Sequence, residues 1–141
     1  MAREYAKQLT RQDLEDYGII DVQWFDGEWV IKRHWYGPGK HIKKRTYTMT
    51  IFDSKGPHKY VEDHYAPMVQ FSYNKKTVPI PVGRLVWAWH KGIVPAKIEV
   101  AYKDHDPYNM YYNFNDDNDP KNNLYLRTIE ERIKEIYTNR R

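Results

Sequence analysis

Cysteine is absent from all 141 residues of this chain. Without thiols, neither a disulfide nor a thiolate zinc site can form, so we expect a protein of a reducing, intracellular environment. The chain also lacks any run of about 18 apolar residues, and no apolar stretch follows the charges near its start. We therefore expect neither a membrane span nor a signal peptide. The length supports one modest hydrophobic core and favours a single compact domain.

Charge is unevenly distributed along the sequence, although the net charge is only +4. Residues 31–60 contain one acidic residue, Asp53, and eight basic residues: Lys32, Arg33, Lys40, Lys43, Lys44, Arg45, Lys55 and Lys59. Residues 104–121 reverse this balance, with five aspartates and one lysine. A basic region beside an acidic loop is typical of a phosphate-binding face next to a cation site. Solvated surface charge is the competing interpretation.

The residue pattern of the first half predicts a short helix and then strands. Thr10 is a suitable N-cap for a helix over residues 10–17, which Gly18 would end. Runs rich in β-branched and aromatic residues at 19–25 and 28–36 flank Asp26-Gly27, a dipeptide typical of two-residue hairpins. Alternation over 41–52 predicts a third strand, and residues 53–66 read as a loop.

The second half predicts another hairpin and two helices. The two strands of the hairpin are expected at 68–73 and 77–82. A helix should follow from Arg84 to about Gly92, then a strand at 98–103 and a polar loop at 104–121. Thr128 and Glu131 have capping-box spacing, which predicts a last helix from 128 to about 138.

Several segments of the second half resemble phage HNH (His-Me finger) endonucleases. In order, they are Arg84-Leu85-Val86-Trp87-Ala88-Trp89, Val94-Pro95-Ala96, Asp106-Pro107-Tyr108-Asn109 and Asn122-Asn123-Leu124-Tyr125-Leu126-Arg127-Thr128. The resemblance covers residues 67–130, with a looser likeness at 10–18. It implies an α+β fold in which antiparallel hairpins are followed by a degenerate ββα module and a C-terminal helix. Residues 1–66 would form the N-terminal helix and basic hairpin region, and 67–141 the HNH-like region, together as one domain.

The resemblance also implies a chemistry that this chain alters. In the family, an Asp-His pair and an Asn surround one divalent metal, and the His activates the attacking water. This chain has Ala101 and Tyr102 in place of the pair, and Gly83 in place of the His that precedes Arg-Leu-Val. Alanine cannot bind a metal, and a phenol with a pKa of about 10 is a poor base near neutrality. We therefore expect a degenerate active site.

A relocated active site is the alternative. Asp104 and His105 follow three residues later, so the catalytic candidates are His105, Asp104 and Tyr102. A three-residue step sends side chains to the other face of a strand, which favours a surface histidine. Asn123 falls on the family's Asn ligand position and, with Asp104, would hold Mg²⁺ or Mn²⁺ in an active enzyme. A turn-forming amide is an equal interpretation of Asn123. A degenerate protein would need no cofactor.

Basic and aromatic residues make nucleic acid the expected partner. The candidate phosphate contacts are Arg33, Lys43, Lys44, Arg45, Arg84, Arg127, Arg132 and Lys134. Aromatic residues make up 16% of the chain, and Trp24, Trp29, Trp35, Tyr47 and Tyr73 alternate with basic residues in the expected strands. They are suited either to stacking on bases or to filling a core.

Three functions remain open at this point. The first is a phage protein of the host cytoplasm that has lost catalysis and binds double-stranded DNA, a host defence factor or a nucleotide-like ligand. The second is an active metal-dependent endonuclease that uses His105. The third is a structural, virion-associated protein that keeps only the fold.

Overall fold

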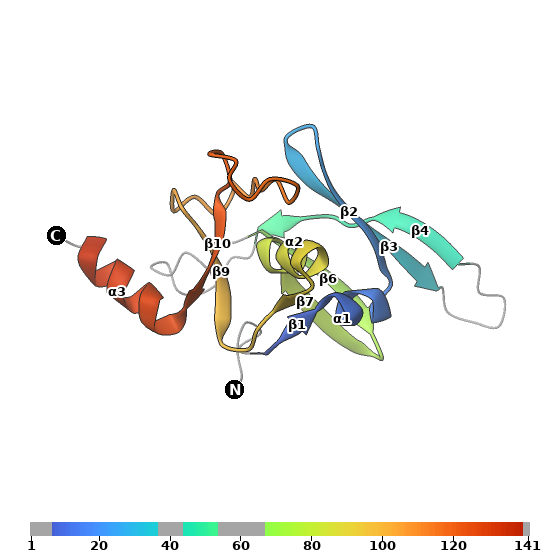
Figure 1. Cartoon of the computed structure of the whole chain (residues 1–141). Helices are drawn as coiled ribbons and strands as arrows, with labels where there is room; N and C mark the ends of the chain where they lie inside the picture. Colours follow the sequence, from blue (N-terminus) through green and yellow to red (C-terminus); the bar gives the residue numbers. More distant parts are fainter. Residues whose placement is uncertain (1–6, 37–43, 54–66, 140–141) are drawn as a thin grey trace.

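The computed structural model describes residues 7–36, 44–53 and 67–139. Within these ranges, four small antiparallel sheets surround a central helix, α2 (Val82–Lys91), as Figure 1 shows. None of the described helices has the length and apolar character needed to cross a bilayer. The mixed α+β class with antiparallel sheets and a C-terminal helix is confirmed.

The first sheet is built on the predicted hairpin. β2 (Ile19–Phe25) and β3 (Glu28–Tyr36) pair antiparallel. They are joined by Asp26 and Gly27, which both have positive φ, 52° and 83°. This backbone conformation matches the twist of the flanking strands. β4 (Lys44–Thr48) adds to the other edge of β3 and completes the sheet.

The chain leaves this sheet earlier than the sequence predicts. Alternation predicted one strand over residues 41–52, but strand structure stops at Thr48 and resumes only at β5 (Phe52–Asp53). Met49 is buried, and its N–H donates to the carbonyl of Ile31 at 2.8 Å. This anchor lies where the chain crosses to the next sheet, which the local pattern does not encode. Residues 41–43 and the predicted loop 54–66 lie outside the described residues.

The second three-stranded sheet contains the other predicted hairpin. β5 pairs with β6 (Pro67–Tyr73), and β6 pairs with β7 (Lys76–Pro81). Asn74 and Lys75 make the turn with positive φ. β7 leads directly into α2, so this hairpin and the central helix form one continuous unit.

α2 and α1 are the two helices at the core. Apolar spacing predicted α2, and seven of its ten residues are buried. The helix ends at Gly92, whose φ of 92° is the left-handed conformation expected of a C-terminal glycine. α1 (Arg11–Asp16) packs against α2, and a capping box between Thr10 and Asp13 starts it as predicted. A short pairing of β1 (Leu9–Thr10) with β8 (Ile93–Val94) ties the two segments together.

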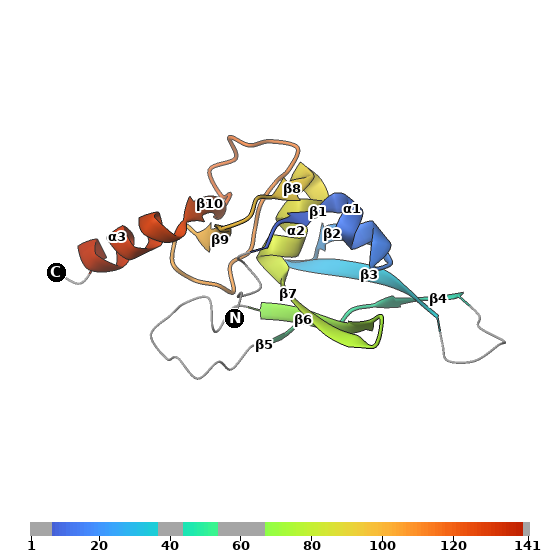
Figure 2. The ribbon, with the colours of Figure 1, turned by 90° about the horizontal axis from the view of Figure 1, so that it is seen from below.

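The last part of the described chain is a hairpin followed directly by a helix. β9 (Ile98–Tyr102) pairs with β10 (Leu124–Thr128), and α3 (Ile129–Asn139) begins at the next residue. The predicted capping box is present, because the Glu131 N–H donates to Thr128 Oγ1 at 3.1 Å and the Thr128 N–H donates to Glu131 Oε1 at 3.3 Å. Figures 1 and 2 show α3 extending away from the rest of the molecule.

One core serves both halves of the sequence. Its buried apolar residues run from Leu9 to Leu124 and include side chains from all four sheets, α1 and α2. Regions 1–66 and 67–141 therefore share their hydrophobic interior, where α2 is the common element.

Candidate functional site

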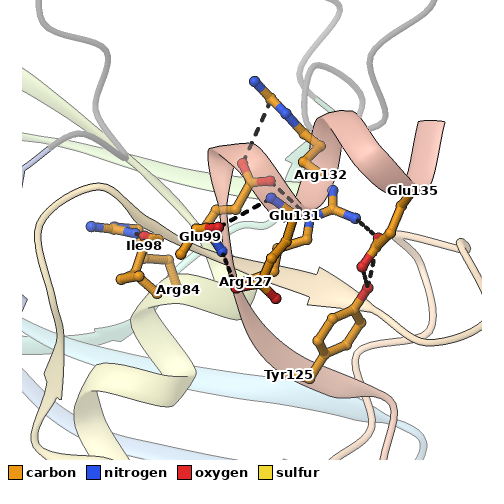
Figure 3. Close-up of polar contacts among 9 residues, drawn as sticks. Arg84, Ile98, Glu99, Tyr125, Arg127, Glu131, Arg132 and Glu135 are labelled. Atoms are coloured by element: carbon orange, nitrogen blue, oxygen red, sulfur yellow. Dashed lines mark hydrogen bonds and ion pairs between the residues drawn. The ribbon is translucent and has the colours of Figure 1, made fainter. Parts of the chain in front are cut away.

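The junction between the β9–β10 hairpin and α3 holds a buried ionic network (Figure 3). Glu99 and Arg127 are cross-strand partners, and Arg127 Nε donates to Glu99 Oε1 at 2.8 Å. The same guanidinium donates through Nη1 to Glu135 Oε2, on α3, at 2.7 Å. The side chains of Arg127 and Glu99 are only 5% and 4% exposed. One guanidinium therefore bridges a carboxylate of the hairpin and a carboxylate of the helix.

Two further side chains complete this network. The Tyr125 hydroxyl donates to the Glu135 carboxylate at 3.0 Å. Burial raises the pKa of Tyr125 most, and this hydrogen bond raises it further. Arg132 Nη1 lies 3.6 Å from Glu99 Oε2. Charges taken out of water are stable only when they are paired and hydrogen-bonded, so the network orients α3 on the hairpin.

Ala101 and Tyr102 lie on opposite faces of β9, as alternation requires. Ala101 is buried and shares the face of Glu99, toward the network. Tyr102 is also buried, and its hydroxyl would be 3.4 Å from a Cβ placed on Gly83 of α2. The Tyr102 phenol thus fills space beside the helix that a side chain at position 83 would need. It belongs to the core rather than to an open site.

Asp104 and Asn123 lie close together at the two ends of the long loop 103–123. Asn123 Nδ2 donates to Asp104 Oδ1 at 2.9 Å and to the Asn109 carbonyl at 2.6 Å, while Asn123 Oδ1 accepts from the Asp104 N–H at 3.1 Å. Asn109 Nδ2 also donates to Asp104, at 2.7 Å. The bond from Asn109 is the largest cause that lowers the pKa of Asp104. The oxygen and the nitrogen of the Asn123 side-chain amide thus both make hydrogen bonds that close the loop, as the turn-forming interpretation expects.

His105 is exposed in the same loop and has a positive φ of 60°. It lies beyond the end of β9, in the turn that follows Tyr102. No cluster of three or more acidic or histidine side chains suited to a metal occurs among the residues that the structure describes. The structure thus brings Asp104 and Asn123 together and leaves the buried network as a separate site.

The candidate phosphate contacts divide into buried and exposed residues. Arg33, Arg84 and Arg127 are buried. Arg33 donates to the Tyr17 carbonyl, the Tyr47 hydroxyl and the Ser72 carbonyl, and Arg84 donates to the carbonyls of Ile98 and Lys7. These guanidinium groups hold segments of the fold together.

The remaining candidates do not form one surface. Arg45 is exposed on β4 and Lys134 on α3, at opposite ends of the molecule in Figure 1. Arg132 is partly buried beside Glu99. Lys43 lies outside the described residues, and the structure describes only the backbone of Lys44. Of this set, Arg45 and Lys134 have described side chains that are exposed to solvent.

The aromatic candidates also divide between core and surface. Trp29 is buried, and its Nε1 donates to the Met110 carbonyl at 2.6 Å. Tyr73 packs edge-on against Tyr17. Trp24 is partly exposed, and its ring meets Tyr111 edge-on at 5.3 Å. The side chain of Trp35 is not described.

Trp24 lines an open groove between the tip of the β2–β3 hairpin and loop 103–123. Its volume is about 780 Å³. The groove is also lined by the side chains of Lys103, Asp104, Tyr108, Asn109, Tyr111 and Lys121.

Sequence reasoning missed both the ionic network and the groove. Glu99 interrupts the apolar run Ile98-Glu99-Val100-Ala101, and charged residues in buried strands are almost always paired. That signal pointed to a partner such as Arg127. The groove left no comparable signal, because it joins residues near position 25 to residues beyond 100.

The chain matches no family model, no curated protein and no solved structure.

Proposed function

We propose that this chain is an HNH-like ββα protein that binds nucleic acid without hydrolysing it. The residues at the family's ligand and base positions carry this proposal, because Ala101 has no ligand atom and the Tyr102 phenol is buried beside α2. In the family that the sequence resembles, two strands and a helix hold a divalent metal. Here Arg127 lies between Glu99 and Glu135 at 2.8 and 2.7 Å. A metal bound by Glu99 and Glu135 would have to displace a guanidinium that already neutralises both carboxylates, and would take from that buried guanidinium the two carboxylates that now pair with it.

The other residues around the junction argue the same way. Metal-assisted hydrolysis needs oxygen ligands for a hard cation and a base whose pKa is near neutrality. Ala101 faces the junction without a ligand atom, and Tyr102 packs against α2. Asp104 and Asn123 are hydrogen-bonded to each other in the loop. Binding therefore accounts for these residues better than cleavage does.

The proposed ligand is double-stranded DNA, bound through the sheet of β2, β3 and β4. The charge of residues 31–60 supports this choice, because phosphate contacts from lysine and arginine dominate non-specific DNA affinity. Lys32 on β3 and Arg45 on β4 are exposed on opposite faces of this sheet, because Arg45 pairs with Trp35, three residues along the strand from Lys32. Arg33 does not contribute, because it is buried.

The test of this proposal combines a cleavage assay and a binding assay. Plasmid DNA is incubated with the protein and Mg²⁺ or Mn²⁺, with parallel reactions in EDTA. Binding of a labelled duplex is measured by fluorescence anisotropy over a salt series. We expect no nicking, and binding that persists in EDTA. Lys32→Glu with Arg45→Glu should lower the salt slope by about 0.9, because the two side chains point to opposite faces of the sheet and a duplex docked on one face loses one phosphate contact.

A matched double reversal controls for the change in net charge. Lys75→Glu with Lys76→Glu alters the exposed β6–β7 turn by the same amount and should leave the slope unchanged. Equal effects of the two double variants would contradict the proposed face. Failure of the wild-type protein to bind DNA would contradict the function itself.

The active-endonuclease alternative has one specific observation in its favour. His105 is an exposed imidazole next to Asp104, which is also exposed, in loop 103–123. Metal-dependent nicking that disappears in His105→Ala would establish this alternative and refute the binding-only proposal. The variant should fold normally, because His105 is on the surface.

A further inference from the structure

We infer that the groove between the β2–β3 turn and loop 103–123 binds an unpaired nucleotide, with the base on its aromatic wall and the phosphates near Lys103 and Lys121. This inference rests on the proposed nucleic-acid function and adds a second binding surface to it. The groove meets the duplex-binding sheet only at the β2–β3 turn, at the other end of β3 from the residue that pairs with Arg45.

The two sides of the groove are rigidly joined beneath it. Trp29 Nε1 donates to the Met110 carbonyl at 2.6 Å, which fastens the hairpin to the loop in the buried interior. Above this bond, the Trp24 ring meets Tyr111 edge-on, with an interplanar angle of 77°. The groove is therefore built before any ligand arrives, and a preorganised site avoids much of the entropy cost of ordering on binding.

The loop wall is equally well ordered by its own hydrogen bonds. Asp104 accepts from the Asp106 N–H at 2.9 Å, from Asn109 Nδ2 at 2.7 Å and from Asn123 Nδ2 at 2.9 Å. The Tyr111 hydroxyl donates to Asp119 at 2.8 Å, which fixes the ring at the groove. A loop of this length usually has a function when it is ordered in this way.

The exposed groups of the groove match the parts of a nucleotide. Tyr108 lines the groove, and its side chain is 58% exposed, so its ring is accessible to a ligand. The negative charge of Asp53, on β5, is the largest cause that raises the pKa of the nearby Tyr108 phenol. Aromatic faces of this kind stack on unpaired bases of any sequence. Lys103 and Lys121 provide ammonium groups on the same lining.

The charge of the loop distinguishes an unpaired strand from a duplex. Five aspartates lie between residues 104 and 119, and two of them, Asp104 and Asp106, line the groove beside the two lysines. The dense phosphates of a duplex would be repelled by this loop. A single strand brings fewer phosphates to the groove and gains stacking and base-edge hydrogen bonds, for which a nearly neutral lining is suited.

The experiment measures anisotropy of a labelled oligodeoxythymidylate of about 12 nucleotides, a length that spans one single-strand site. Tyr108→Ala should weaken its binding roughly 5- to 100-fold, the usual range for loss of one stacking partner. Lys103→Glu with Lys121→Glu should lower the salt slope by about 1.4, because a single-strand phosphate contact contributes about 0.7. Duplex binding should change little in either variant.

Two control variants separate this inference from the proposed function. Lys75→Glu with Lys76→Glu carries the same charge change outside the groove and should leave single-strand binding intact. Lys32→Glu with Arg45→Glu should weaken duplex binding and spare the oligodeoxythymidylate. Thermal unfolding of every variant verifies that a loss of binding is not a loss of fold.

The possible failures are distinguishable. If the groove variants bind the oligodeoxythymidylate as tightly as the control variant does, the groove is not the site, and the duplex-binding proposal stands. If wild-type protein binds a duplex but no single strand, the same conclusion follows. If it binds neither, the proposed function and this inference both fail.

Discussion

Arg127 offers the sharpest test of how the β9–β10 hairpin and α3 are held together. Replacing it with methionine keeps most of the aliphatic volume and removes the charge. The Glu99 side chain, which is only 4% exposed, would then lose the guanidinium that now contacts it at 2.8 Å. Breaking a buried ion pair from one side costs about 3–5 kcal/mol of stability, because the remaining charge stays desolvated.

The loss is measured by chemical denaturation and by thermal melting. For a domain of this size, it corresponds to a fall in Tm of roughly 10–20 °C. The comparison variant is Glu15→Gln, which breaks the Arg11–Glu15 pair at 3.1 Å on the surface, where both side chains are 46% exposed. Exposed pairs contribute about 0–1 kcal/mol, so this variant should melt close to wild type.

A double variant identifies the origin of the loss. Glu99→Leu with Arg127→Met removes both charges, and an apolar pair in their place should restore much of the stability. If Arg127→Met alone costs less than about 1 kcal/mol, the guanidinium is not the buried bridge described above.

Three further predictions concern the loop, the central helix and His90. Asn123→Asp places a carboxylate against Asp104 and the Asn109 carbonyl in place of a donor, so it should cost about 2–4 kcal/mol in denaturation; stabilisation of the wild-type protein by Mg²⁺ that disappears in Asn123→Ala would show instead that Asn123 is a metal ligand. Gly83→Leu should lower the free energy of unfolding by about 1–3 kcal/mol, because the new side chain overpacks against Tyr102. The double variant with Tyr102→Ala should lose less stability than the sum of the two single variants, and an additive loss would contradict this contact. Burial lowers the pKa of His90 from 6.5, so the stability that neutral His90 contributes is complete above pH 6.5 and is lost as the pH falls through its folded pKa. Melting curves at about pH 7.5 and about pH 5 should therefore differ more for wild type than for His90→Gln, and equal differences would refute the assignment.

The local elements of this protein could be predicted from the sequence because their signals lie within a few residues. Asp26-Gly27 predicted a turn, Thr10 and Thr128 predicted helix starts, and Gly92 predicted a helix end, all of which the structure confirms. Each depends on backbone conformation or on a hydrogen bond between near neighbours, and so does not require knowledge of the rest of the chain.

The strand predicted over 41–52 is confirmed only in part, at 44–48 and at 52, because the break between them depends on the rest of the molecule. Its alternation is real, but Met49 is buried and is the last residue held to β3, through its N–H and the Ile31 carbonyl, and from Phe52 the chain pairs with β6 instead. Propensity describes a residue in an average environment, and tertiary packing overrides it where two sheets compete for one segment.

The candidate site shows the same division. The sequence by itself determined which chemical groups are present: an alanine and a tyrosine at positions 101 and 102, an aspartate-rich loop after them, and a basic stretch in the first half. Only the tertiary structure decided that Arg127 bridges Glu99 to Glu135, that Arg33 and Arg84 are internal, and that Trp24 meets Tyr111 across a groove. These contacts join residues far apart in sequence, and whether a charge is buried or exposed follows from packing, which no local pattern contains.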